Sequence, residues 1–316
     1  MAKRVFLVTG AAGFVGANVC RRLAERNEEV HIFVKHTTDL WRLEDLKPGL
    51  HVHEVDVCDE RRVDERVAAI RPTVVYHLAT HGAYARQSDA DTILLVNVFG
   101  LWNLLQACNK HGYELFVNTG SSSEYGRKAF AMRETDLLEP DSYYAVAKSA
   151  QSLLARLTAQ LEHRPVVTLR LFSVYGPYEQ PGRLMPTLMM AALHDQPIDM
   201  VDPQTARDFV YVDDVVDVYL NVDRLKPVAA EVLNVGTGVQ STMTDVVETT
   251  QSLTGKTLQV RWGAMPPRPW DSSVWVADVT KLRRLAGLCP RTTLREGIAK
   301  CLPWFKDHAG LYRSEG

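Results

Sequence analysis

The 316-residue sequence has few cysteines, no long apolar run and almost no net charge. Its five cysteines lie far apart and include no C-x-x-C pair, which excludes a disulfide framework and a zinc knuckle. We expect reduced thiols and a cytoplasmic protein. Lys and Arg number 36 against 38 Asp and Glu, so no bulk positive field exists to attract nucleic acid or an anionic membrane. We expect neither as a partner.

The amino-terminal segment imitates a signal peptide, because a basic tip precedes the apolar residues 5–8. Gly10, Gly13 and Gly16 interrupt the apolar stretch, and Arg21-Arg22 follows. A membrane span needs about 20 mostly apolar residues, so we expect neither an export signal nor a span here. We also expect no span later in the chain.

The first half of the chain alternates short β-branched runs with amphipathic stretches of helical period. The runs at 5–8, 30–34, 73–78 and 114–118 are continuously apolar, as strands buried on both faces are. The stretches 17–26 and 59–70 have the pattern of covering helices. This alternation predicts an α/β fold, a Rossmann-type doubly wound parallel sheet.

Three glycines stand between the first predicted strand and the first predicted helix: Gly10, Gly13 and Gly16. Glycine lets the backbone turn tightly and approach a pyrophosphate, while the following helix offers free N–H groups and its positive dipole end. The position of this turn therefore predicts a dinucleotide site.

The composition of the sequence changes after residue 172. Glycine and proline become frequent there, which predicts irregular loops and short helices. We predict a dinucleotide-binding Rossmann domain at 1–172. We predict a smaller, turn-rich substrate domain at 173–316, with some of its segments returning to the first domain.

The end of the second predicted strand bears on the choice of dinucleotide. Lys35 and His36 follow that strand, and no acid appears until Asp39. An acid here would accept hydrogen bonds from the ribose of NAD, whereas a lysine favours the 2′-phosphate of NADP. We favour NADP, with NAD as the alternative.

A tyrosine and a lysine, Tyr144 and Lys148, are four residues apart on a predicted helix, so they share one face. A nearby ammonium stabilises a phenolate and would lower the pKa of the tyrosine from about 10 toward a working range. Ser121 begins a three-serine run just after the strand predicted at 114–118, where strand ends form a ligand crevice. This pattern indicates proton transfer.

The chain resembles the extended short-chain dehydrogenase/reductase family, of the NAD-dependent epimerase/dehydratase type that modifies nucleotide sugars. The motifs that carry the resemblance are G-x-x-G-x-x-G at 10–16, His77-Leu-Ala79, Asn97-Val-Phe-Gly100, Ser121-Ser-Ser123, Tyr144-x-x-x-Lys148, Arg170 to Pro177, Arg207 to Asp213 and Asn234 to Gly238. The resemblance implies that Ser121 bonds the reacting sugar oxygen, Tyr144 is the acid/base, and Lys148 also holds the nicotinamide ribose.

The resemblance also implies binding residues and an assembly. Expected cofactor contacts besides those already named are Ala12, Phe14, Val15, Asp56, Val57, Leu78, Ala79 and Asn97. Expected contacts to a nucleoside diphosphate sugar are Ser122, Ser123, Ser173, Arg183, Arg207 and Arg268, although relatives usually have Asn in place of Ser173. The guanidinium fork of Arg207 and of Arg268 suits a diphosphate. A homodimer through the helices near 101–110 and 143–160 is also implied.

Three functions fit these residues. Dehydratases of the family carry Asp-Glu directly after the catalytic hydroxyl, and here Glu124 comes one position too late. Our main interpretation is a 4-keto-6-deoxysugar reductase, and the segment 120–126 is similar to that of GDP-4-keto-6-deoxymannose reductases. The alternative is a nucleotide-sugar 4-epimerase with tightly bound NAD. A non-catalytic dinucleotide-sensing module is a third possibility.

Histidines are the remaining candidates for a metal site. His77 and His81 lie at a strand end, and His51 and His53 lie on a predicted strand, without a cluster of carboxylates nearby in the sequence. We expect these histidines to bind no metal.

Overall fold

A seven-stranded parallel sheet forms the centre of the protein, as the computed structural model shows for residues 3–84, 87–266, 268 and 271–312. The strand order is β11-β6-β5-β4-β1-β2-β3, with parallel pairing throughout. The strands are β1 (Val5–Thr9), β2 (Glu29–Val34), β3 (His51–Glu54), β4 (Val74–His77), β5 (Leu115–Ser121), β6 (Val166–Leu171) and β11 (Val232–Val235). The first strands build outward from β1 in both directions, which confirms the doubly wound Rossmann-type fold.

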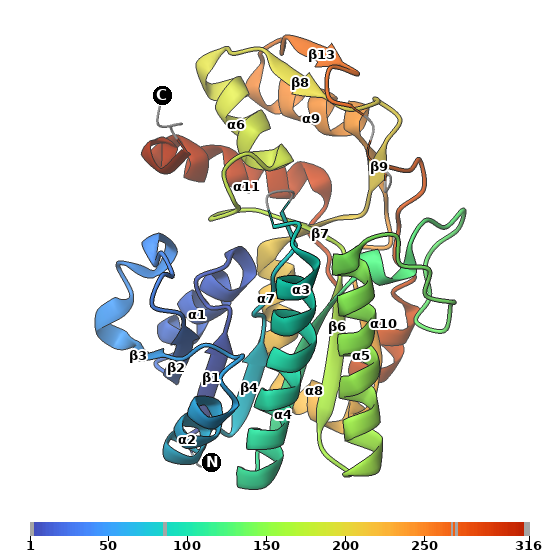
Figure 1. Cartoon of the computed structure of the whole chain (residues 1–316). Coiled ribbons are helices and arrows are strands. Elements are labelled where there is room, and N and C mark those ends of the chain that lie inside the picture. The colour runs from blue at the N-terminus through green and yellow to red at the C-terminus, as the bar shows by residue number, and fades with distance from the viewer. Residues whose placement is uncertain (1–2, 85–86, 267, 269–270, 313–316) are drawn as a thin grey trace.

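Helices cover both faces of the sheet (Figure 1). The helices α1 (Phe14–Glu25), α7 (Val212–Leu220) and α10 (Thr280–Ala286) pack on one face, and α2 (Glu60–Ile70), α4 (Gly100–His111) and α5 (Tyr143–Leu161) pack on the other. Along β1 the side chains of Phe6 and Val8 enter the first layer and that of Leu7 enters the second. Because all three are buried, the run is apolar without interruption.

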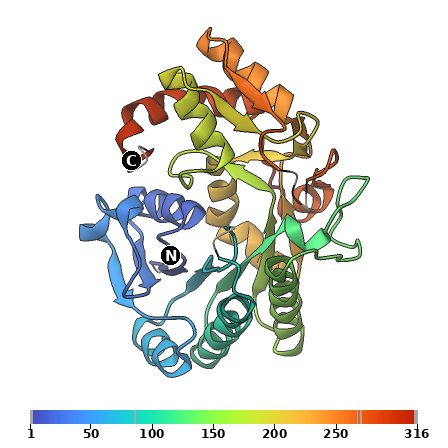
Figure 2. The same cartoon turned by 45° about the horizontal axis from the view of Figure 1, so that its top comes forward.

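A second, smaller core lies beyond the carboxyl ends of the strands (Figures 1 and 2). It is built from α6 (Leu184–His194), α9 (Met243–Thr254) and α11 (Leu294–Asp307), with β8 (Ile198–Met200) paired to β13 (Val260–Trp262). Its largest members are aromatic and sulfur-containing side chains such as Phe305, Tyr175 and Met189.

Short elements complete the described part of the structure. They are α3 (Ala90–Leu94), α8 (Val222–Leu225), the two-stranded pairs of β7 (Ser173–Tyr175) with β10 (Phe209–Tyr211) and of β9 (Ala206–Arg207) with β12 (Ser241–Thr242), a π-helical turn at Leu95–Phe99, and 3₁₀ turns at Trp41–Leu43, Lys47–Gly49, Ser122–Tyr125, Lys226–Val228 and Ala309–Tyr312. After residue 172 the chain returns to the sheet at α7, β11 and α10. The domain boundary at 172/173 stays a prediction.

The predicted elements agree with the observed ones except at their ends. The first helix begins three residues before the predicted start at 17, and β5 extends to Ser121 rather than ending at 118. Both differences come from positions where a glycine or a polar residue masked the periodicity. Glycines at 13 and 16 interrupt the helical pattern, and Thr119 and Ser121 interrupt the apolar strand pattern.

We expected no later part of the chain to be long and apolar enough to span a membrane. By length and composition alone, one helical stretch meets these criteria. The continuous helical stretch Ala90–His111 has 22 residues, and the mean hydropathy of its most apolar part is 1.3, which is enough for a membrane span by length and composition alone. In the structure 44% of its most apolar part is buried, and α4 packs against α2 and the sheet. A helix that covers a core meets the same criteria, so the measure is weak evidence for a span.

Candidate active site

The glycine turn is shaped by close contact with the residues that follow β4. Gly10 has a φ of +71°, and a Cβ atom on it would lie 2.4 Å from the carbonyl carbon of Leu78. A Cβ on Gly16 would lie 2.3 Å from the carbonyl oxygen of Gly10. No side chain fits at either position without displacing backbone. The glycines therefore let the turn lie against the neighbouring strand end.

The start of α1 is open to an anion. Gly13 is the residue that precedes the helix, no side chain caps the helix, and its first turn contains no acid. The first N–H groups, at Phe14 and Val15, point out of the helix together with the positive end of its dipole. A glycine cradle that a Cβ would fill, next to an uncapped helix start, fits the pyrophosphate of a dinucleotide. Ala12 closes the turn with its carbonyl bonded to Arg42 Nη1 at 3.1 Å.

The residues expected near the adenosine lie at the ends of β2 and β3. Lys35 and His36 are exposed just beyond β2, and His36 Nδ1 lies 3.3 Å from Glu54 Oε2 at the end of β3. Asp56 accepts a hydrogen bond from the N–H of Cys58 at 3.0 Å, and Val57 is buried beside Gly100.

The side chain of Asn97 is hydrogen-bonded to the loop that follows β4. Its side chain is fully buried and accepts from the His81 N–H at 2.8 Å and from the Thr80 hydroxyl at 3.1 Å. It also donates to the His81 carbonyl at 2.8 Å. Asn97 lies in the π-helical turn, a type of distortion that often occurs at functional sites. Its contacts fix the backbone that continues from Leu78 and Ala79.

The serine, tyrosine and lysine predicted to transfer protons lie together at the carboxyl edge of the sheet. Ser121 ends β5, and its side chain lies close enough to that of Tyr144 to lower the pKa of the phenol. Lys148 Nζ lies 6.0 Å from the centre of the Tyr144 ring and donates to the Thr119 carbonyl at 2.9 Å. A Cβ on Gly82 would lie 3.4 Å from Tyr144 Cβ, so the loop after β4 contacts both the glycine turn and this group.

Burial is the largest influence on the pKa values of Tyr144 and Lys148. It raises the pKa of Tyr144 to about 12, and the interaction with Ser121 lowers it only in part. Burial also lowers the pKa of Lys148 to about 8, against the opposing attraction of the Glu124 carboxylate. Because the pKa of Tyr144 is raised, the expected lowering of the tyrosine pKa is not found. The Lys148 ammonium is directed at Thr119 and Gln151, each 2.9 Å away, rather than at the phenol oxygen.

Glu124 is fully engaged in holding the end of β5. One carboxylate oxygen accepts from the Ser121 N–H at 2.8 Å, which forms a capping box for the following turn. The other accepts from Arg170 Nε at 2.7 Å, and both side chains are buried. Glu124 therefore orients Ser121 and is not directed at a substrate.

Two of the arginines expected to bind a diphosphate, Arg183 and Arg268, act electrostatically on the third, Arg207. Burial lowers the pKa of Arg207, and the nearby charges of Arg268 and Arg183 lower it further while Asp271 opposes them. Arg207 Nη2 donates to Asp271 Oδ1 at 3.0 Å, and the Arg268 N–H donates to Asp271 Oδ2 at 2.9 Å. Arg183 is exposed at the start of α6. Arg183 Nε lies 3.9 Å from Glu179 Oε1, so among the described residues three guanidinium groups accompany two carboxylates, which leaves an excess of one positive charge.

The serines expected to contact substrate differ in their surroundings. Ser123 Oγ accepts from the Ser121 hydroxyl at 3.0 Å. Ser122 is buried, and its hydroxyl accepts from Trp275 Nε1 at 3.1 Å. Ser173 opens β7 and donates its backbone N–H to the Asp208 carbonyl.

Sequence reasoning missed two buried charges that shape this region. Arg42 donates to the Tyr178 carbonyl at 2.7 Å and to Gln180 at 2.8 Å, and so joins the glycine turn to the segment before α6. Asp208 accepts from the N–H groups of Thr237 and Gly238 at 2.8 and 3.0 Å. Asp208 stands in the Arg207 motif and could have been noticed there. Nothing in the sequence near Arg42 indicates its role.

Comparison with known proteins identifies the family. The model of the NAD dependent epimerase/dehydratase family matches residues 6–236. The chain belongs to this family. A UDP-glucose 4-epimerase of Thermotoga maritima, solved with UDP-glucose, is 26% identical with a TM-score of 0.87 over 96% of this chain and 99% of that one. The protein MoeE5, solved with UDP-glucose and NAD, is 31% identical with a TM-score of 0.85 over 96% and 99% of the two chains. A dTDP-glucose 4,6-dehydratase of Neisseria meningitidis is 26% identical over 96% of this chain and 94% of the relative.

The family membership confirms the resemblance found in the sequence. The protein is an enzyme of the extended short-chain dehydrogenase/reductase class, in a family of nucleotide-sugar epimerases and dehydratases that use NAD. The expectation of a 4-keto-6-deoxysugar reductase finds less support than its alternative, because the similar solved structures include 4-epimerases.

Proposed function

We propose that the protein is a 4-epimerase of a UDP-activated hexose that uses bound NAD. The observation that carries the proposal is the meeting of Ser121, Tyr144 and Lys148 at the sheet edge beside the glycine turn. The ligands named for similar structures, UDP-glucose and NAD, support this choice of substrate and cofactor.

The residues of the chain divide the chemistry between them. NAD held at the glycine turn would supply reversible hydride transfer at C4 of the sugar, which is the chemistry that inversion of this carbon needs. The Tyr144 phenol oxygen exchanges a proton with the C4 oxygen, and the Ser121 hydroxyl donates a hydrogen bond to that oxygen as negative charge develops. The Lys148 ammonium adds positive charge on the same side of the helix. The residues that would hold NAD are the glycine turn, the start of α1 and the loop after β4.

The surroundings of Glu124 argue against a dehydratase. Removal of water from the sugar needs a second acid and a base near C5 and C6. Glu124 is the acid nearest to Ser121 in the sequence, but both of its oxygens are bound, to the Ser121 N–H and to Arg170. A carboxyl group engaged on both oxygens is poorly placed to exchange a proton with a bound sugar.

The reductase remains the second candidate, and one observation favours it. Lys35 is exposed at the end of β2, where a cation would attract the 2′-phosphate of NADP. Against this, His36 is paired with Glu54 at the same place, and a carboxylate repels a phosphate. We therefore propose NAD in preference to NADP.

The guanidinium groups of Arg207, Arg268 and Arg183 are proposed to bind the diphosphate of the substrate. The charges of Arg268 and Arg183, which add to the lowering of the Arg207 pKa by burial, support this proposal, because a diphosphate would offset them. Asp271 accepts from the Arg207 guanidinium group and from the Arg268 backbone N–H, and so ties these two residues together.

We further propose a homodimer. The outer faces of α4 and α5 expose large apolar side chains that continue from one helix to the next, and a second copy of this face would cover them. These side chains are Phe99 and Trp102 on the first helical stretch and Val146, Leu153, Leu157 and Leu161 on α5. Sedimentation of the wild-type protein and of a Leu157→Glu variant tests this, with dimer and monomer expected.

Two measurements on one purified sample test the proposed reaction. Mass spectrometry under non-denaturing conditions should show NAD retained by the protein. Incubation with UDP-glucose, without added cofactor, should yield the 4-epimer until an equilibrium is reached. NADPH consumed in proportion to a 4-keto-6-deoxysugar would instead establish the reductase, and loss of water from dTDP-glucose would establish the dehydratase.

A further inference from the structure

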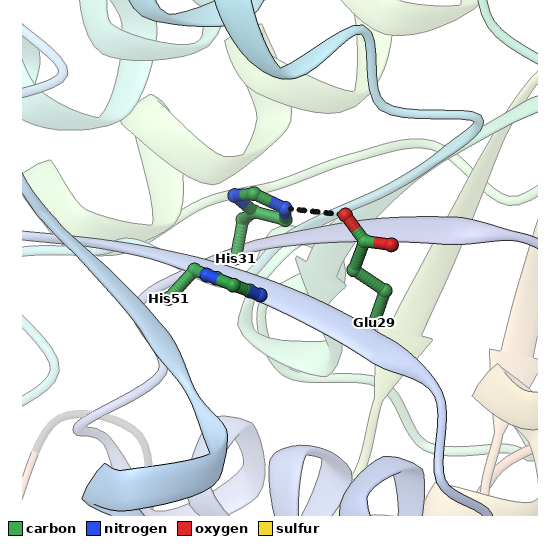
Figure 3. Close-up of side chains that lie close together, drawn as sticks. All are labelled: Glu29, His31 and His51. Atoms are coloured by element: carbon green, nitrogen blue, oxygen red, sulfur yellow. Dashed lines mark hydrogen bonds and ion pairs between the residues drawn. The ribbon is translucent and has the colours of Figure 1, made fainter.

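Three imidazoles and a carboxylate gather on one face of the sheet edge, away from the proposed active site. Glu29 and His31 lie two residues apart on β2, so both side chains point to the same face. The edge strand β3 pairs in register, with His51 directly opposite His31. Glu29, His31 and His51 therefore face one another across two strands, as Figure 3 shows.

The distances suit a single ion. One ligand atom from each of Glu29, His31 and His51 lies within 4.8 Å of the other two. Zinc binds imidazole nitrogen at about 2.0–2.1 Å in tetrahedral geometry, which places its ligand atoms roughly 3.4 Å apart. His31 Nε2 and Glu29 Oε1 are already 3.2 Å apart. The exposed His51 ring, stacked 4.5 Å from the His31 ring, has to turn to complete the set.

The outer side of His31 is also arranged for ligation. Its second ring nitrogen, Nδ1, lies 2.8 Å from His53 Nε2. A hydrogen bond of this kind fixes which nitrogen carries the proton and leaves the other free for a metal.

We propose that Glu29, His31 and His51 form a site for one divalent transition-metal ion of the zinc type. Two imidazole nitrogens and one carboxylate oxygen are ligands that zinc accepts, and the exposure of His51 leaves a fourth position for water. The sequence alone predicted no metal here, because the carboxylate comes from β2 and only strand pairing brings it to the histidines of β3.

The place of the site in the fold defines what the ion would do. Glu29 is the first residue of β2, whereas the glycine turn follows the carboxyl end of the adjacent β1. The ion would therefore join β2 to the edge strand at the end of the sheet opposite the dinucleotide. It would stabilise the edge of the sheet and take no part in the reaction.

Calorimetric titration of the untagged, chelator-treated full chain with zinc chloride tests the proposal. We expect one zinc per chain for the wild type and a loss of affinity of about ten-fold or more for His51→Gln. His194→Gln is the matched control, because His194 is equally exposed but lies on α6, and it should bind like the wild type. Because His51 is exposed, this substitution should not prevent folding.

A cobalt titration gives an independent readout. Bound Co²⁺ should give the visible absorption of a tetrahedral site in the wild type and in His194→Gln, and not in His51→Gln. Equal zinc binding by wild type and His51→Gln, or no saturable binding by the wild type, would overturn the proposal. Loss of epimerase turnover on chelation, restored by zinc, would also overturn it by placing the ion in the reaction. Failure of the proposed reaction itself would leave the zinc titration unaffected.

Discussion

Replacing Glu124 by Gln should destabilise the fold strongly although the two side chains are nearly the same size. The amide oxygen can still accept from the Ser121 N–H, but the charge that faces Arg170 is lost. Arg170 is 4% exposed in its side chain and Glu124 is 0% exposed, so the remaining guanidinium would be a buried charge without its counterion. Removing one partner of a buried ion pair costs about 3–5 kcal/mol.

Urea unfolding followed by circular dichroism measures this loss. The variants are Glu124→Gln, Arg170→Met and the double substitution. The double variant should lose less than the sum of the two single variants, because it leaves no unpaired charge. Glu65→Gln removes one partner of an exposed ion pair with Arg61 on α2 and should unfold close to the wild type. A loss below about 1 kcal/mol for Glu124→Gln would refute the reasoning.

Three further predictions concern the cofactor turn, a buried acid and the substrate cation. Gly10→Ala should lose NAD retention in native mass spectrometry and destabilise the fold by about 1–3 kcal/mol, because the Cβ would meet Leu78 and φ is positive. Undiminished retention would contradict the role of the glycine turn in NAD binding. Burial raises the pKa of Glu179 to about 8, so the unfolded state ionises first and the free energy of unfolding should fall as pH rises from about 4.5 to 8. Glu179→Gln should lessen that fall in urea melts at pH 5 and pH 8, and an unchanged slope would exclude this carboxyl as its source. Arg207→Met should raise KM for UDP-glucose at least ten-fold with a smaller effect on kcat, as for loss of a charged hydrogen bond to phosphate; an unchanged KM would remove Arg207 from the diphosphate site.

The fold was predictable because its signals are local. Continuous apolar runs gave the buried strands, and the glycine turn gave the strand-to-helix junction at Gly10. The requirement for glycine at positions 10 and 16 has a physical cause, since a Cβ at either position would strike backbone.

The protonation of the site was less predictable. Tyr144 and Lys148 are a helical turn apart, and this spacing predicts that they share a face. It does not show that the Lys148 ammonium donates to Thr119 and Gln151, or that burial outweighs its charge at the phenol. Those effects depend on how completely the surrounding strands exclude water.

Contacts between residues far apart in the sequence could not be predicted from it. Glu124 stands one position after the place where dehydratases of the family carry a catalytic acid, and only the position of Arg170 on β6 shows its structural role. Glu29 and His51 are 22 positions apart and meet only through strand register. Such contacts depend on the assembled sheet and leave no periodic signal.

Turnover of UDP-glucose by Tyr144→Phe, compared with Tyr143→Phe, tests the central claim most directly. The first substitution removes the hydroxyl that lies near Ser121, and the second removes a hydroxyl from the neighbouring, exposed ring. Loss of a positioned acid/base group should lower kcat about 10²–10⁴-fold in Tyr144→Phe and leave Tyr143→Phe like the wild type. Equal turnover by the wild type and Tyr144→Phe would contradict the assignment of this site.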